Sequence, residues 1–180
     1  MNLPITPFKD KLLAELARAG SLILAAPTGS GKSTQTPQFL FGAVKGRVLV
    51  LEPRRISARS LAARVASETK SPLGQKIGYQ VRFDSRCGAG TQVVFQTYGV
   101  FISQMLRDPE LKGVDAVLLD EFHERTLECD LALAWLKALR AKRRPDLKLV
   151  VMSATLDGAS LQKYLPSKKS LRWTIYPIRP

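Results

Sequence analysis

The chain has 180 residues, 45% of them hydrophobic, which is enough to bury one substantial core and leaves little room for a second domain. The formal net charge is +13, and basic residues extend from Lys9 to Arg179, a distribution that favours a surface facing a polyanion such as nucleic acid. A membrane surface is the competing partner, but no uncharged apolar segment is long enough to span a bilayer and no Lys/Arg-faced amphipathic helix stands out.

The cysteine content and the first residues bear on the cellular compartment. Cys87 and Cys129 are too few for a disulfide framework, and His123, the one histidine, cannot complete the roughly four N/S ligands that zinc prefers. The N-terminal stretch MNLPITPFKDK lacks the apolar region of a secretory signal because prolines and charges interrupt it. We therefore expect reduced thiols, a cytoplasmic location and no membrane partner.

Short apolar runs alternate with helical patterns along the chain. An opening helix is predicted by apolar residues at helical spacing between Leu12 and Ala17, and it should stop at Gly20. Strands are predicted over residues 21–26, 47–53, 76–83, 91–97, 114–121 and 147–155. Helices are predicted after the first strand and within 57–68, 131–144 and 157–165. Because continuous Val/Leu runs indicate strands buried on both faces, this alternation predicts a doubly wound α/β domain, a parallel sheet with helices on both faces.

In such sheets ligands bind at the carboxyl ends of the strands. Five distinctive stretches follow predicted strands, and they read PTGSGKST, EPRR, TYG, DEFH and SAT. We therefore expect these stretches to meet at one edge of the sheet.

The stretch APTGSGKST fits the phosphate-binding loop pattern, except that Ala26 stands where a glycine is usual. Gly29 and Gly31 would let backbone N–H groups turn toward phosphate oxygens at the start of a helix. Lys32 would neutralise the β and γ phosphates, and the Ser33 hydroxyl can bind Mg²⁺. A surface Gly/Ser turn is the alternative, but a strand before the loop and a helix after it favour phosphate binding.

Two carboxylates end the apolar run VDAVLLDE. Acidic residues in this position can simply mark the turn into solvent. With a nucleotide phosphate nearby, however, Asp120 would hold Mg²⁺ directly or through water, and Glu121 would orient and deprotonate the attacking water. His123 follows them, and a solvent-exposed histidine in a turn is the alternative interpretation of that residue.

Six motifs stand in one order along the chain: GSGKSTQTPQ, EPRR, GYQVRFDS, TYG, DEFHER and MSAT. Together they resemble the first RecA-like domain of the DEAH/DExH helicases of superfamily 2, and the resemblance covers nearly the whole chain. It implies a RecA-like P-loop NTPase domain over residues 1–170, with the last strand and the start of an interdomain linker over 171–180. It also implies that a second RecA-like domain, absent from this sequence, completes the helicase, so that the chain is an excised or truncated N-terminal half.

The resemblance assigns roles residue by residue. It implies ATP binding by Thr28, Gly29, Ser30, Gly31, Lys32, Ser33 and Thr34, with Arg64 packing against adenine. It implies Mg²⁺ binding by Ser33 and Asp120, and catalysis by Lys32, Asp120, Glu121 and His123. Coupling of nucleotide state to the second domain would fall to Ser153 and Thr155. Contacts to a single nucleic-acid strand would come from Arg54, Arg55, Arg82, Thr97 and Gly99, although ordinary solvated arginines remain an alternative.

The sequence also departs from the family pattern. Phe122 replaces the third residue of the usual DEAH motif, and Tyr98 stands where an acidic residue is common. Neither change removes a catalytic group, so we expect modest effects on packing or substrate path. The preference for RNA over DNA rests on the resemblance, because none of these residues reads a 2′-hydroxyl directly.

Three functions compete at this point. The first is the motor half of an ATP-dependent RNA helicase. The second is a basic nucleic-acid-binding module without ATP turnover. A P-loop kinase or transporter ATPase is the third, and it does not account for EPRR, TYG and SAT together.

Overall fold

A computed structural model describes residues 3–154 and 173–174 of the chain. Its sheet has the strand order β4-β3-β5-β2-β6-β7-β1-β8. The strands are β1 (Ser21–Ala25), β2 (Arg47–Glu52), β3 (Ile77–Val81), β4 (Asp84–Arg86), β5 (Val93–Thr97), β6 (Val114–Leu119), β7 (Lys148–Ser153) and β8 (Trp173–Thr174). The helices are α1 (Lys9–Ala19), α2 (Lys32–Phe41), α3 (Arg55–Glu68), α4 (Tyr98–Arg107) and α5 (Leu127–Lys142), with short 3₁₀ turns at Thr6–Phe8 and Phe122–Glu124.

The strands are parallel with one exception, so the predicted α/β class is confirmed with a correction. Strand β4 is antiparallel to β3, and Val81 pairs with Asp84 across a two-residue turn. Phe83 in this turn has a positive φ of 66°, which a tight hairpin requires. The sequence pattern predicts parallel strands throughout and a strand that continues to Phe83, and the hairpin corrects both expectations.

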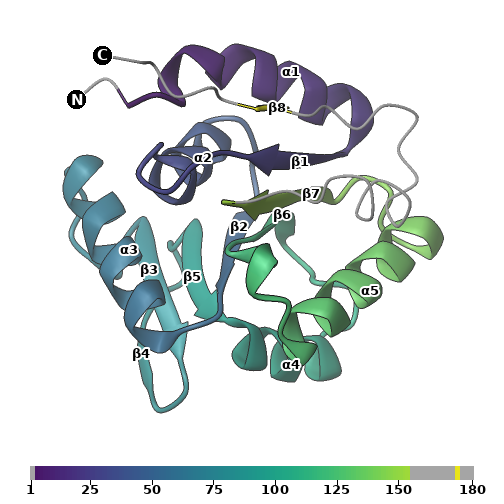
Figure 1. Cartoon of the computed structure of the whole chain (residues 1–180). Coiled ribbons are helices and arrows are strands. Elements are labelled where there is room, and N and C mark those ends of the chain that lie inside the picture. The colour runs from purple at the N-terminus through teal and green to yellow at the C-terminus, as the bar shows by residue number, and fades with distance from the viewer. Residues whose placement is uncertain (1–2, 155–172, 175–180) are drawn as a thin grey trace.

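Helices cover both faces of the sheet, as Figure 1 shows. Helices α1, α2 and α3 share one buried cluster with Val48 and Val50 of β2. Helices α4 and α5 share the other cluster with Leu49 and Leu51 of the same strand. Because successive side chains of a strand point to opposite faces, a continuous apolar run feeds both cores. The central strands are therefore held rigidly between two helical layers.

Local signals explain the limits of two helices. Helix α1 ends where Gly20 adopts a left-handed φ of 70° and donates its N–H to the carbonyl oxygen of Leu16. Helix α2 begins at Lys32, directly after the Gly31 turn, and continues past Pro37 to Phe41. Pro37 is buried within this helix and does not end it.

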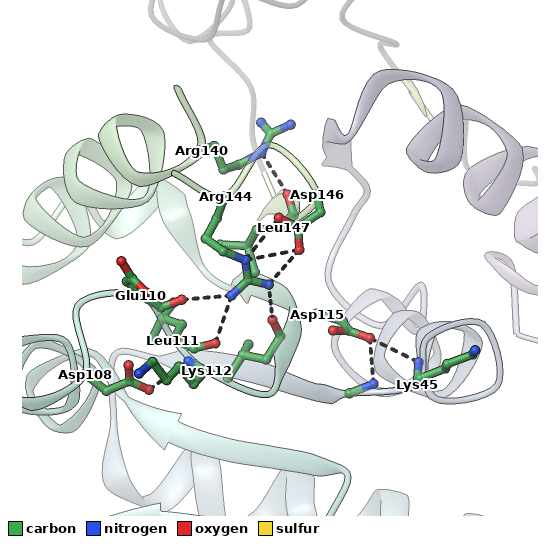
Figure 2. Close-up of polar contacts among 12 residues, drawn as sticks. Lys45, Asp108, Glu110, Leu111, Lys112, Asp115, Arg140, Arg144, Asp146 and Leu147 are labelled. Carbon is green, nitrogen blue, oxygen red and sulfur yellow. Dashed lines mark hydrogen bonds and ion pairs between the residues drawn. The ribbon is translucent and has the colours of Figure 1, made fainter. Parts of the chain in front are cut away.

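Arg144, which follows α5, connects the amino ends of β6 and β7. Its guanidinium donates hydrogen bonds to the carbonyl oxygens of Glu110, Leu111 and Val114 at 2.8, 3.0 and 2.8 Å, and it also pairs with Asp146 (Figure 2). One side chain thus fixes the loop that leads into β6 against the loop that leads into β7. This structural end of the sheet lies opposite the carboxyl ends that carry the motifs.

None of the helices in the described part of the chain has the length and apolar character that crossing a bilayer requires. The predicted helix at 157–165 and most of the predicted last strand and linker lie outside the described residues. The division of the chain at residue 170 stays a prediction.

Candidate nucleotide-binding site

The strand register brings the motifs to one edge of the sheet. Ala25 at the end of β1 pairs with Ser153 at the end of β7, and Glu52 at the end of β2 pairs with Thr97 at the end of β5. The loops after these strands therefore leave the sheet side by side. The expectation that the motifs meet at the carboxyl ends of parallel strands agrees with this geometry.

The phosphate loop joins β1 to α2. Gly29 and Gly31 have φ angles of 81° and 92°, a left-handed conformation that side chains rarely adopt. A Cβ atom at Gly31 would also lie 2.9 Å from Cδ1 of Leu3, whereas a Cβ at Gly29 would meet nothing within 4 Å. Ala26 does not have a positive φ, and its N–H donates to the carbonyl oxygen of Ser153 at 3.1 Å. Alanine therefore fits where the family pattern has glycine.

Lys32 places its ammonium group inside the site. Its side chain is only 4% exposed, and Nζ lies 3.4 Å from Oε1 of Glu121, 89 residues later in the chain. A cavity of about 440 Å³ adjoins this pair, and its lining includes Thr28, Gly29, Ser33, Thr34 and Arg64. Ser30, within the loop, is buried. The loop and Glu121, one member of the acid pair Asp120 and Glu121, thus line one cleft, which is the juxtaposition that a nucleoside triphosphate needs.

Asp120 follows β6 and is completely buried. Its N–H donates to the carbonyl oxygen of Leu51, and its Oδ1 accepts the N–H of Glu121 at 2.8 Å. Oδ2 has no hydrogen-bond partner of good geometry among the described residues. Burial raises the pKa of Asp120, while hydrogen bonding from Ser33 lowers it and the charge of Glu121 raises it again. A buried carboxylate beside Ser33, with one oxygen that lacks a well-placed donor, is a fitting position for a divalent cation.

Glu52 is a buried carboxyl group that is not among the predicted site residues. It ends β2, beside Asp120, and its Oε1 has no partner in the described chain. Burial raises its pKa well above the usual range, and the neighbouring Asp120 raises it further. The available signal was the first letter of EPRR, an acid at the end of an apolar strand. What the sequence did not reveal is that β2 and β6 are neighbours.

Glu121 lines the cavity, and His123 lies beside it, near the end of β7. Glu121 adopts a left-handed conformation, with φ of 49° and ψ of 37°, as the chain turns into the 3₁₀ segment. Its Oε2 lies 3.3 Å from Nδ1 of His123, and the backbone N of Ala154 lies 3.5 Å from the same ring nitrogen. His123 therefore contacts both Glu121 and Ala154. Ala154 directly follows Ser153, which is buried at the end of β7. Thr155 lies outside the described residues.

The residues expected to contact nucleic acid gather around the same edge. Arg54 and Arg55 are exposed at the start of α3, and Arg54 pairs with Glu124 at 3.2 Å. Thr97 and Gly99 flank the start of α4. Arg82 is exposed in the β3–β4 turn, with its guanidinium carbon 4.8 Å from the centre of the Phe83 ring. These positions are open to a ligand, and their roles stay predictions.

Arg64 and Phe122 occupy different environments. Arg64 projects from α3, lines the cavity and pairs with Glu68 at 2.6 Å. Phe122 is buried in the core beneath α4 and α5, so the departure at this position serves packing. Of the two modest effects expected from the sequence, on packing and on substrate path, the one at Phe122 concerns packing.

A mostly parallel sheet with a phosphate loop and an acid pair in one cleft defines a P-loop nucleoside triphosphatase domain of the RecA type. Within that class, the chain belongs to the DEAD/DEAH box helicase family, whose sequence model matches residues 6–164.

Two curated relatives illustrate the match. The chain is 44% identical over 167 residues to ATP-dependent RNA helicase HrpB of Escherichia coli strain K12, covering 92% of this chain and 21% of that protein. It is 41% identical over 162 residues to human probable ATP-dependent RNA helicase DHX34, covering 90% of this chain and 14% of that protein. A crystal structure of Escherichia coli DEAH/RHA helicase HrpB superposes with a TM-score of 0.87 and 43% identity, over 93% of this chain and 22% of that one. The chain thus spans about a fifth or less of these relatives.

Proposed function

We propose that this chain is the ATP-binding N-terminal domain of an ATP-dependent RNA helicase of the DEAH/DExH type, similar to HrpB. Joined to a second RecA-like domain, it would hydrolyse ATP to drive translocation along a single strand and unwinding. The observation that carries the proposal is the contact of 3.4 Å between Lys32 and Glu121 beside the cavity, with Asp120 buried next to them. The names of the relatives support RNA as the substrate.

The residues present fit ATP and Mg²⁺. Gly29 to Thr34 would bind the phosphates through backbone N–H groups and Lys32, and Arg64 would lie against the adenine. Ser33 and Asp120 would hold Mg²⁺, which in such sites takes one or two protein oxygens and completes its shell with phosphate and water. When bound, the ion neutralises charge on the phosphates. Glu121 would orient the attacking water and accept its proton, held in place by His123.

Nucleic acid would bind along the edge that carries Arg54, Arg55, Arg82, Thr97 and Gly99. Arginines would contact phosphates, and the net charge of +13 would favour any polyanion. A single strand fits the proposal because successive backbone phosphates can follow the row of strand ends. Ser153 and Thr155 would relay nucleotide state to the second domain. We place the protein in the cytoplasm, which the free thiols of Cys87 and Cys129 support.

Equilibrium binding of Mg·ATP tests this function. Lys32→Ala should weaken binding by about tenfold or more, because it removes a buried cation from the phosphate site. Lys112→Ala is the matched control, since Lys112 is an exposed lysine at the opposite end of the sheet, and it should leave the affinity unchanged. Equal affinity for wild type and Lys32→Ala would favour the basic module without ATP turnover.

The chain alone should hydrolyse ATP poorly. A second domain is expected to bring the arginine finger, which contributes roughly 10³ to 10⁵ in rate. Phosphate release with and without oligouridylate measures this. A robust, strand-stimulated ATPase from these 180 residues would contradict the division of labour between two domains.

A further inference from the structure

A buried hydrogen bond connects the TYG motif to the acid pair. The Tyr98 hydroxyl donates to the main-chain carbonyl oxygen of Asp120 at 2.8 Å. Tyr98 begins α4, between Thr97 and Gly99, and only 3% of its surface is exposed. Its ring packs in the same core cluster as Phe122, so the hydroxyl is held by packing as well as by the bond.

The position of the accepting carbonyl gives this bond its significance. The peptide group between Asp120 and Glu121 is held at both polar atoms by side chains. Its oxygen accepts the Tyr98 hydroxyl, and its N–H donates to Oδ1 of Asp120 at 2.8 Å. Rotation of this peptide would break both bonds and would remove the N–H that now holds Oδ1 of the Asp120 carboxylate.

The same peptide stands where β6 leaves the sheet. Asp120 still donates its N–H to the carbonyl oxygen of Leu51, but Glu121 already has a left-handed φ of 49°. A non-glycine residue in this conformation persists when its surroundings fix it. Tyr98 supplies a fixing contact from a neighbouring element to the residue whose carboxylate lies beside Ser33.

We propose that Tyr98 is a positioning residue that fixes the Asp120–Glu121 peptide and thereby links the start of α4 to the magnesium-binding carboxylate. This inference rests on the proposed function. Thr97 and Gly99, on either side of Tyr98, are the residues expected to contact the strand. A displacement of the first turn of α4 by bound nucleic acid would therefore reach Asp120 through one hydroxyl group.

A purely structural role for Tyr98 makes a different prediction. If the ring only fills the core, removal of the hydroxyl changes stability and leaves the response of nucleotide binding to Mg²⁺ intact. Tyr98→Phe keeps the ring and removes the bond. Tyr79→Phe is the matched control, because Tyr79 is equally buried and its hydroxyl donates to Asp84 at 3.0 Å, away from the acid pair.

The experiment measures the dissociation constant of ADP by titration calorimetry, in Mg²⁺ and in EDTA, on chains shown to be folded by urea unfolding. In Tyr98→Phe the ratio of the two constants should fall by about fivefold, the factor that corresponds to one ordinary hydrogen bond, with the EDTA value nearly unchanged. Tyr79→Phe should keep the wild-type ratio. A wild-type ratio in Tyr98→Phe, or an equal fall in both variants, would overturn the role of Tyr98.

A second measurement needs only the wild-type chain. Mg·ADP should slow amide hydrogen exchange in the first turn of α4, although this turn is not among the residues that line the cavity. Unchanged exchange there would also overturn the link. A wild-type ADP affinity that does not respond to Mg²⁺ would instead overturn the proposed function, and this inference with it.

Discussion

Nζ of Lys32 lies 3.4 Å from Oε1 of Glu121, so the lysine expected to hold phosphate and the acid expected to activate water form an ion pair across the cleft. Lys32 is 4% exposed at its side chain, whereas Glu121 is 28% exposed. The pair satisfies the buried ammonium group when no phosphate is present. Under the proposed function, a bound phosphate would draw Lys32 away from Glu121 and leave the carboxylate free to face water.

Glu121→Gln separates the role of Glu121 in activating water from its ion pair with Lys32. The amide cannot accept the proton of the attacking water, so ATP hydrolysis by the two-domain protein should fall by at least about a hundredfold. Mg·ATP binding should be at least as tight as in wild type, because phosphate no longer competes with a charged partner for Lys32. Glu124→Gln, which affects the pair with Arg54, is the control for charge. Markedly weaker nucleotide binding in Glu121→Gln would contradict this account.

The buried carboxyl groups make stability depend on pH in a definite direction. The pKa of Glu52 and that of Asp120 are both raised by burial first, so the folded chain holds protons that the unfolded chain has lost. The free energy of unfolding should therefore fall as pH rises from about 4 through the folded pKa values. Glu52→Gln should make the decrease of the unfolding free energy with pH less steep. Urea unfolding in EDTA between about pH 5 and pH 8 measures it, and an unchanged slope would show that Glu52 is not the source.

Arg54 and Arg55 provide a test of the nucleic-acid edge. Their replacement by alanine should weaken binding of oligouridylate and reduce the slope of log affinity against log salt by about 0.7 for each phosphate that is no longer neutralised. Arg143→Ala removes the same charge at the opposite end of the sheet, where Arg143 pairs with Glu110. Fluorescence anisotropy at several salt concentrations gives the slopes. Equally weakened binding in all three variants would indicate attraction by net charge alone.

Arg144 should matter for stability and little for binding. Arg144→Lys keeps the charge but cannot reach the three carbonyl oxygens and Asp146 together, so the free energy of unfolding should fall by about 2 kcal/mol or more. Urea unfolding measures the change, and ADP titration of the folded variant should give the wild-type affinity. A loss of affinity without a loss of stability would contradict the structural role that Figure 2 indicates.

The sequence predicted the central strands well because their residues are apolar without interruption. Strand β2 was expected over 47–53 and is observed over Arg47–Glu52, because its apolar run is short and is bounded by Gly46 and Pro53. Two elements were missed. Strand β4 has three residues with no apolar pattern, and α4 begins with Tyr98 and Gly99, which give no helix-start signal. Packing of Phe101 and Met105 in the core, which only the fold reveals, stabilises α4.

The placement of Lys32, Asp120 and Glu121 near one another was predictable, because their motifs follow strand ends, and their roles stay predictions. Contacts that depend on strand order were not predictable. Glu52 meets Asp120 because β2 neighbours β6, and Tyr98 meets the Asp120 carbonyl across 22 residues of sequence. Local patterns carry no information on which strands become neighbours, so a buried carboxyl pair and a linking hydroxyl appear only in three dimensions.

The response of ADP affinity to Mg²⁺ in Asp120→Asn tests most directly whether the phosphate loop and the acid pair serve one bound nucleotide. In wild type, Mg²⁺ should tighten ADP binding. In Asp120→Asn this tightening should shrink by about tenfold or more, while the affinity in EDTA stays close to wild type because Lys32 and the loop are intact. Full tightening by Mg²⁺ in Asp120→Asn would contradict the account, because the ion would then be held without the acid at the end of β6.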